Sequence, residues 1–547
     1  MATEQKDLEV SQLENVAVDE KNVGIDLKTG HLPGKNAEEA ARILEAAGGG
    51  IEYTLADNKR ILRKIDLFVC VPMCLTYLLQ QLDKSSLSYA AVFDLQTDTH
   101  LVGTQYAWLT SVVYCAQLVC QPLSSYALIA FPVKYWVAFN MAGWAIVTAC
   151  TSAAKNFTGL VICRLLLGMF EATILPSFIF ITQMWWTRRE QSYRTIAVQV
   201  ANSGAVFIGP LLSYGVGHIN KGILPYQAIF LFLGCLCLAA VPYVLWSLPN
   251  SPTDARFLKT DNDRLIAIER LRENNTGIKS NKWQWSHVKE VFMDPKSYMW
   301  AGMYFCTACP SGGIGAFGGL ITKGFGFDTF TTILMQMPTG AIGILTLLIG
   351  IFFTNRFKTR WLVILCIVLP PIAGAVALTQ VGRNEPSTLI ACYYIIWLYG
   401  GIQPLLYTWA NSNAGGTTKR VVTFAFMFAF QCTGNIVGPQ VYLTMEAPYY
   451  HTGLYVDIGC WSVLCLLIIS MRFYLAHLNR KQEAKRVAMG LPADLKDMSI
   501  MSHEEADAYK QELTAMLAQK GMTEAQLFEN AFDDLTDKQN PMFMYIL

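Results

Sequence analysis

Long apolar runs, separated by short polar stretches, follow one another from about residue 65 to residue 476. Each run is long enough to cross a bilayer, because about 20 residues of α-helix span roughly 30 Å of hydrocarbon. A polar interval from Leu248 to Pro295 divides the runs into two sets of six. The predicted spans are residues 65–92, 105–126, 134–153, 159–184, 195–217 and 226–247, followed by 297–321, 329–353, 361–380, 387–409, 420–443 and 453–476.

This pattern predicts an all-α integral membrane protein with 12 transmembrane helices in two six-helix bundles. Short helices are expected in the tails at residues 36–47 and after the capping-box patterns that begin at Ser502 and Thr523. The expected domains are a cytoplasmic tail at 1–64, the first bundle at 65–247, a cytoplasmic loop at 248–296, the second bundle at 297–476 and a cytoplasmic tail at 477–547.

Composition agrees with a membrane protein and argues against several other classes. Of 547 residues, 53% are hydrophobic and 15% charged, which is more apolar than a soluble core can bury. The net charge is +1, so the sequence does not indicate a basic domain that binds nucleic acid. All fifteen cysteines lie in apolar runs and are expected to be small hydrophobes, including the C-x-x-C pair Cys306 and Cys309. We find no catalytic triad, phosphate-binding Gly loop or metal cluster, so we expect no enzyme, no ATP-driven pump, no cofactor and no metal.

Basic residues indicate the orientation, because loops rich in Lys and Arg stay in the cytoplasm. With both termini inside, the inner loops hold fourteen basic residues and the outer loops hold four. The opposite orientation would translocate nearly every basic cluster. We therefore expect a multi-pass plasma membrane protein with cytoplasmic termini. Asn156-Phe157-Thr158 then lies outside, which makes Asn156 a candidate glycosylation site.

The fourth span carries two charges of opposite sign. Arg164 and Glu171 lie seven residues apart, and so on one face of the helix. A charge inside a membrane span costs about 3 to 10 kcal/mol, depending on its surroundings. The pair therefore indicates an aqueous cavity beside this helix.

A short motif occurs twice at matching positions. Residues 203–210 in the fifth span read SGAVFIGP, and residues 433–439 in the eleventh read TGNIVGP. A basic turn precedes each copy. Such a repeat is typical of secondary transporters, whose two bundles form a site at their interface. Gly and Pro are also common in membrane helices, which would explain either copy alone.

Four stretches carry a resemblance to a known family. They are LDKSSLSYA from Leu82, RLLLGMFEATILP from Arg164, WWTRREQSYR from Trp185 and NSNAGGTTKR from Asn411. Over about residues 60–480, the sequence resembles the major facilitator superfamily and, within it, the fungal allantoate-permease-like branch of the anion:cation symporters. The resemblance implies a transporter that moves small organic anions together with protons.

The sequence also departs from the family pattern. Lys134 is the only charge between the second and third spans, and Thr354-Asn355-Arg356 stands where an Asp-Arg pair is usual, which weakens two gate contacts. Asp83 and Lys84 begin a motif in which the family commonly has Asp-Arg-x-Asn. Lysine keeps the charge of arginine but loses its planar fork, so the substrate need not be a typical carboxylate of the family.

Four charged residues are the main candidates for transport chemistry. Arg164 either clamps an anionic substrate or forms a structural salt bridge to Asp83 or Glu171. Glu171 is the expected proton carrier, since burial favours the protonated form of a carboxylate. Lys84 is a second candidate ligand for the anion, with Asp83 as its ion-pair partner in the empty state and as a further proton-coupling group.

Two further sets of residues complete the candidate site. Amide side chains are plausible substrate ligands, although interhelical hydrogen bonding explains each equally well; they are Gln336, Gln403, Gln431 and Asn435. Charged side chains are expected to form a cytoplasmic gate; they are Arg188, Arg189, Glu190, Arg194, Lys419 and Arg420.

The leading hypothesis is a proton-coupled importer of a small organic anion that works by alternating access and acts as a monomer. Its expected partners are the anion, protons and the lipid bilayer. An exporter of a fungal metabolite is an alternative within transport, to which Gly209-Pro210 points. A nutrient sensor that binds without transporting is an alternative of another class.

Overall fold

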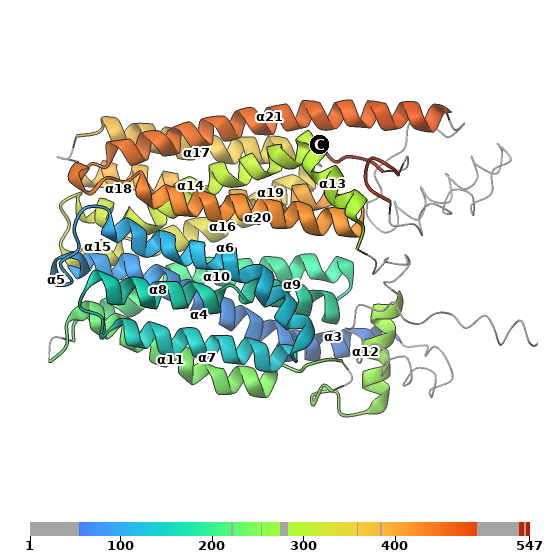
Figure 1. Cartoon of the computed structure of the whole chain (residues 1–547), viewed down its shortest axis with the longest axis horizontal. Coiled ribbons are helices and arrows are strands. Elements are labelled where there is room, and N and C mark those ends of the chain that lie inside the picture. Colours follow the sequence, from blue (N-terminus) through green and yellow to red (C-terminus); the bar gives the residue numbers. More distant parts are fainter. Residues whose placement is uncertain are drawn as a thin grey trace, which may run out of the picture.

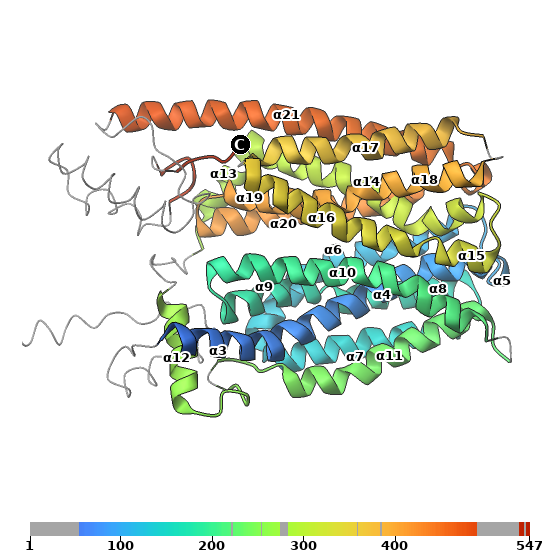
Figure 2. The same cartoon turned by 180° about the vertical axis from the view of Figure 1, so that it is seen from behind.

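The computed structural model describes residues 54–219, 222–252, 254–273, 283–357, 359–382, 385–488, 535–540 and 543–547. Every regular element within these ranges is a helix, which confirms the predicted all-α class. The long helices lie side by side along the longest axis of the molecule (Figures 1 and 2). The expected tail helices at 36–47 and after Ser502 and Thr523 fall outside the described residues.

The first half begins with a continuous helical rod in which a π-helical turn, η1, joins α3 to α4. Its remaining helices follow the predicted spans closely. The elements are α3 (Leu55–Ile65), η1 (Asp66–Cys70), α4 (Val71–Val92), α5 (Leu95–Asp98), α6 (Gln105–Ala130), α7 (Val133–Thr151), α8 (Phe157–Glu171), α9 (Ile174–Trp185), α10 (Arg188–Gly217) and α11 (Pro225–Ser247).

The second half follows two helices of the central loop, α12 (Asp261–Glu273) and α13 (Trp285–Met293). Its last helix continues twelve residues beyond the predicted end at 476. The elements are α14 (Pro295–Lys323), α15 (Thr329–Leu334), α16 (Met337–Phe357), α17 (Arg360–Gln380), α18 (Pro386–Ile396), η2 (Trp397–Gly401), α19 (Ile402–Ser412), α20 (Thr417–Gln440), η3 (Thr444–Glu446) and α21 (His451–Ala488).

Nine helical segments of the described chain are long and apolar enough to cross a bilayer, judged by length and composition. The long helices α6, α7 and α14 are not among these nine. Gln and Ser residues in α6, and Gly and Pro residues in α14, lower the apolar content of those two helices. The count of twelve spans therefore stays a prediction.

Helices α3–α11 form one layer of the molecule and α14–α21 the other (Figure 2). One apolar core, with Trp144 and Trp185 fully buried, lies almost entirely in the first layer. The other, with Trp409 and Trp461 fully buried, fills the second layer and continues into the first, where it includes Tyr106. One end of the molecule carries α3, α12, α13 and the last residues of the chain, and we name it the α12 end (Figure 1). The opposite end, with α5 and α15, is the α5 end.

Helix α12 is tied to α3 by an ion-pair cluster at the α12 end. Asp263 contacts Arg60 at 2.8 Å and Lys64 at 2.7 Å. Burial alone would raise the pKa of Asp263, but these two cations hold it below its ordinary value. The cluster thus fixes the central loop to the first half.

Contacts between the halves gather toward the α5 end. Tyr106 donates to the Ala316 carbonyl at 2.8 Å, and Lys323 contacts Asp94 at 2.8 Å. Helices α10 and α16 approach backbone to backbone, because a Cβ at Gly340 would lie 2.3 Å from the Phe207 nitrogen. The halves therefore approach each other closely where α16 begins.

The repeated glycine motif performs a similar packing task in each half. A Cβ at Gly209 on α10 would lie 2.7 Å from the Tyr89 hydroxyl of α4, and one at Gly438 on α20 would lie 2.1 Å from the Cys309 carbonyl of α14. The first copy therefore packs the fifth predicted span on the first, and the second copy packs the eleventh on the seventh. The correspondence supports two repeated halves.

We expect Gly438→Ala to destabilise the second half, because the added methyl group meets a backbone atom that cannot rotate away. Overpacking of this kind costs about 1–3 kcal/mol. The measurement is the melting temperature of the purified protein in detergent. Gly204→Ala is the matched control, since no heavy atom lies within 4 Å of its added Cβ. Equal melting temperatures of the two variants would contradict the assigned role of Gly438.

Candidate functional site

Helix α8 places both charges of the fourth span in the protein interior. Asn156 begins the helix by accepting a hydrogen bond from the Gly159 nitrogen at 2.9 Å, and the helix ends at Glu171. Arg164 is 3% exposed and Glu171 2% exposed. Asn156 itself is exposed at the α5 end, and its glycosylation stays a prediction.

Helix α4 brings Lys84 to Glu171. The Lys84 ammonium lies 3.6 Å from Glu171 Oε2, and the Gln117 amide donates to the same oxygen at 3.1 Å. The other carboxylate oxygen, Oε1, makes no hydrogen bond with the described residues. Glu171 therefore has one paired oxygen and one that is free to hold a proton.

The prediction that Lys84 pairs with Asp83 is wrong for this structure. Asp83 is fully buried and accepts a hydrogen bond from the Cys237 thiol at 3.2 Å. Consecutive residues of a helix point about 100° apart, so Asp83 turns toward α11 while Lys84 turns toward α8. Glu171, rather than Asp83, is the partner of Lys84.

Arg164 lies with its guanidinium carbon 5.3 Å from the ring centre of Phe230. Its Nε and Nη2 atoms make no hydrogen bond within the described part of the chain. A buried cation stacked on an aromatic ring is partly compensated, but unpaired donors still carry a desolvation cost. The guanidinium N–H groups are therefore available to donate hydrogen bonds to an acceptor that enters the site.

Arg164 and Lys84 line one small cavity with a volume of about 40 Å³. The other lining residues supply apolar walls, one hydroxyl and one phenol; they are Leu87, Leu109, Thr110, Val113, Tyr114 and Leu167. Two cations in an otherwise apolar pocket attract an anion. Glu171 lies next to this cavity through its contact with Lys84.

The four candidate amides lie in the second half and are not among the residues that line this cavity. Gln336 donates to Thr322 at 2.8 Å and accepts from the Tyr393 hydroxyl at 3.1 Å, so it joins α14 to α18. Asn435 donates to the carbonyl of Gln431 within α20. Gln403 and Gln431 are half-buried. Their role as substrate ligands stays a prediction.

The candidate gate residues lie at the α12 end. Glu190 accepts from Arg270 at 2.7 Å, and Arg194 contacts Asp66 at 2.6 Å. The side chains of Arg188 and Arg189 are not among those described.

In the second half, Lys419 contacts Glu290 at 2.9 Å, Asp294 at 3.2 Å and Asp537 at 2.7 Å. Arg420 donates to the Ala414 carbonyl at 2.9 Å. Lys419 thus has partners next to the second half and in the last residues of the chain. Glu190 and Arg194 have their partners in α12 and in the first half.

Three polar residues of the long helices have no place in the sequence-based prediction. Gln117 and Tyr114 lie in the second predicted span, and Asp457 lies in the twelfth. Asp457 is fully buried and accepts a hydrogen bond from Tyr442 at 2.6 Å. Asp457 could have been predicted in the same way as Glu171, because each is a carboxylate inside an apolar run.

Comparison with known proteins decides the family. The sequence model of the Major Facilitator Superfamily matches residues 73–439. The chain belongs to the major facilitator superfamily. Within the superfamily it belongs to the fungal allantoate-permease-like branch.

Curated relatives of this superfamily member are transporters. An uncharacterized transporter of Schizosaccharomyces pombe is 31% identical over 90% of this chain and 88% of its own length. The thiamine pathway transporter THI73 of Saccharomyces cerevisiae is 30% identical over 78% of this chain and 81% of its own. The allantoate permease of the same yeast is 24% identical over 93% of this chain and 90% of its own.

Solved structures of the superfamily share the fold. A bacterial homologue of the human lysosomal transporter Spinster has a TM-score of 0.57 at 15% identity and covers 74% of this chain and 96% of its own. The xylose transporter XylE from E. coli has a TM-score of 0.56 at 12% identity and covers 74% of this chain and 97% of its own. The family match and the curated transporters identify the chain as a secondary transporter of the major facilitator type.

For a transporter of this superfamily, we expect the gate charges to change partners between two access states. Neutralising Arg189 and Arg420 together should alter how readily a cysteine introduced at the α12 end is labelled. The measurement is labelling by a membrane-impermeant maleimide. Equal labelling of the double variant and the parent would contradict a gating role for these two residues.

Proposed function

We propose that this secondary transporter imports a small organic anion together with protons by alternating access. The observation that carries the proposal is the cavity in which Arg164 and Lys84 meet beside Glu171. We further propose that the protein works as a monomer in the plasma membrane with both termini in the cytoplasm, as the distribution of basic residues favours.

The two cations support an anionic substrate. Arg164 has unpaired donors on its guanidinium, and a carboxylate can accept two hydrogen bonds from this planar group. Lys84 adds a second positive charge, half-buried above the Tyr114 ring at 6.0 Å. The apolar walls favour a substrate that carries its charge at one end of an uncharged body. An allantoate permease is among the relatives.

The contact between Lys84 and Glu171 supports coupling to protons. While the cavity is empty, Glu171 neutralises the lysine. An arriving anion competes for the same ammonium group, which leaves the buried carboxylate without its partner and favours its protonation. Substrate and proton then bind together, because each lowers the free-energy cost of the other.

Uptake of labelled candidates into cells tests this proposal. We expect accumulation of an anionic substrate that rises as the outer pH falls and is lost when a protonophore is added. Candidates are single nitrogen, carbon and vitamin sources that carry a carboxylate, screened first by growth of a deletion strain. Accumulation that is insensitive to the protonophore would contradict proton coupling, and higher cellular levels in the deletion strain would indicate export.

A further inference from the structure

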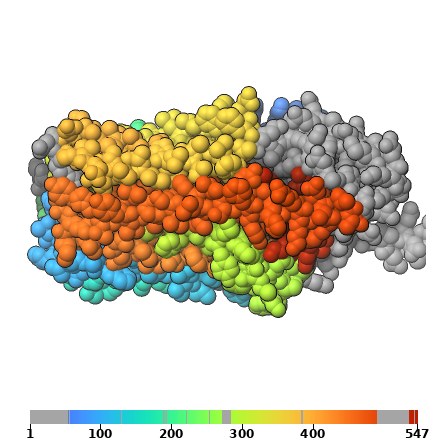
Figure 3. Space-filling view, turned by 90° about the horizontal axis from the view of Figure 1, so that it is seen from above, coloured from blue at the N-terminus to red at the C-terminus, as the bar shows by residue number. Residues whose placement is uncertain are grey.

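The last described segment of the chain lies against the α12 end of the second half. Its residues, 535–540 and 543–547, are drawn in dark red beside α21 (Figures 1 and 3). Thr536 and Asp537 are fully buried, and Tyr545 and Ile546 are 3% and 7% exposed. This C-terminal segment is therefore seated in a surface that five helices of the second half provide.

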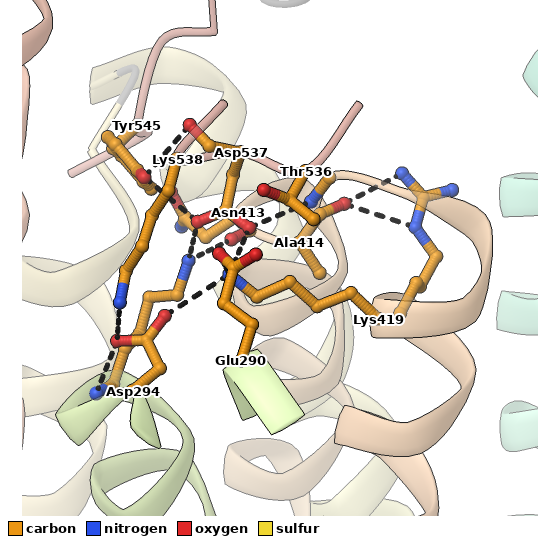
Figure 4. A network of polar contacts seen from close by, with 12 residues as sticks. Glu290, Asp294, Asn413, Ala414, Lys419, Thr536, Asp537, Lys538 and Tyr545 are labelled. Atoms are coloured by element: carbon orange, nitrogen blue, oxygen red, sulfur yellow. Dashed lines mark hydrogen bonds and ion pairs between the residues drawn. The ribbon is translucent and has the colours of Figure 1, made fainter. Parts of the chain in front are cut away.

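Asp537 is the charged anchor of the segment (Figure 4). Its carboxylate forms ion pairs with Lys296 of α14 and Lys419 of α20, both nearly fully buried, and accepts a hydrogen bond from Tyr545 at 2.8 Å. Burial alone would raise the pKa of Asp537, but the two lysines hold it well below its ordinary value. The carboxylate is therefore charged at neutral pH.

Two asparagines of the bundle bind the backbone at the other end of the segment. Asn479 of α21 accepts from the Tyr545 nitrogen and donates to its carbonyl, both at 2.8 Å. Asn413, at the end of α19, pairs with the next residue, Ile546, in the same way at 2.8 and 3.0 Å. Paired donors and acceptors that hold an extended backbone are a common mode of peptide recognition.

We propose that the α12 end of the second half is a peptide-binding site, that the C-terminal segment is its removable ligand, and that its occupation holds the transporter open at the α12 end. The two asparagines bind backbone and supply affinity, whereas the buried lysines select an acidic residue eight positions before the tyrosine. The inference does not depend on the substrate or on protons.

Occupation of the site affects opening through Lys419. This gate lysine is held by Asp537 of the segment together with Glu290 of α13 and Asp294, which precedes α14. Closing the α12 end would bring the charged residues of α10 toward α20. A lysine that is fully engaged by its own half offers no attraction for that movement. Release of Asp537 removes one of these three partners and favours closure.

The first test is peptide binding. A protein lacking residues 536–547 should bind a fluorescent peptide of the sequence TDKQNPMFMYIL, whereas the full chain should not, because its site is filled. Replacing the aspartate of the peptide by asparagine should weaken binding by about 100-fold, since it leaves two buried lysines unpaired. Absence of binding to the folded, shortened protein would overturn the proposed site.

A second variant covers the case in which the shortened protein does not fold. In the full chain, Asp537→Asn should loosen the resident segment and let the labelled peptide exchange into the site. Asp261→Asn is the matched control, because it removes an equal charge from an exposed pair at the same end of the molecule. Exchange into the Asp261 variant, or none into the Asp537 variant, would overturn the proposal.

The second test measures opening directly. Spin-labelled amino acids at Tyr193 and Val421, both exposed near the α12 end, report the distance between the halves there. Labels at Val102 and Met445 report it at the α5 end. Removal of the segment should shorten the first distance and lengthen the second, and added peptide should reverse both changes. Unchanged distances would overturn the link between occupation and opening.

Discussion

Arg164→Ala is expected to abolish transport while the protein still reaches the membrane. The guanidinium lines the cavity with unpaired donors, so its loss removes one of the two cations that receive the anion. Arg164→Lys keeps the charge but loses the planar fork, and should weaken apparent affinity by about 10-fold, or about 1.4 kcal/mol. Uptake of the labelled substrate over a range of concentrations measures both effects.

Arg472→Ala is the matched control for the arginine variants. It also removes a cation that lies over aromatic rings, at 5.8 Å from Trp361 and 5.5 Å from Phe473, but it lies on α21. We expect this control to transport normally. Normal transport by Arg164→Ala, or an uncharged substrate, would mean that Arg164 has only a structural role and that the anion-clamp mechanism is wrong.

Glu171→Gln is expected to leave a folded protein that exchanges substrate across the membrane but no longer accumulates it. Glutamine fills the same volume but cannot lose or gain a proton in this pH range. It also removes the negative charge from Lys84, which lies 3.6 Å away, so substrate binding should persist. Counterflow in vesicles measures exchange, and uptake with an imposed pH gradient measures accumulation.

Asp457→Asn controls for the loss of a buried carboxylate elsewhere in the chain. Asp457 is as deeply buried as Glu171, but it bonds to Tyr442 and is not part of the cavity lining. We expect this variant to accumulate substrate. A Glu171→Gln protein that still accumulates in response to the pH gradient would remove Glu171 from the coupling mechanism.

Features that depend on short stretches of sequence could be predicted well. Hydrophobic runs indicate where most of the long helices lie, because about 20 residues of helix are needed to cross a bilayer. The end of α21 was missed, since residues 477–488 are polar and yet continue the helix with good helix formers. An apolar run marks a span, but it does not mark where the helix ends.

Pairings across helices could not be predicted from the sequence. Lys84 and Glu171 are 87 positions apart, and the neighbouring Asp83 was the simpler partner to expect. The position of Gln117 beside Glu171 depends in the same way on how α6 packs against α8. The C-terminal segment belongs to a tail that reads as polar. Its contacts, Asp537 with Lys296 and Ile546 with Asn413, depend on how the tail folds back onto the bundle.

The close approach of α10 and α16 at Gly340 has a geometric consequence for the movement of the two halves. With only backbone atoms between the helices, this contact can serve as the axis of a rocking motion. Helix α16 ends at Phe357, seventeen residues beyond Gly340, and so extends about 25 Å from this point. A rigid-body rotation of about 15° would move its far end by roughly 7 Å and hardly displace the contact itself. A small tilt at one glycine is thereby converted into an opening wide enough for a metabolite to pass.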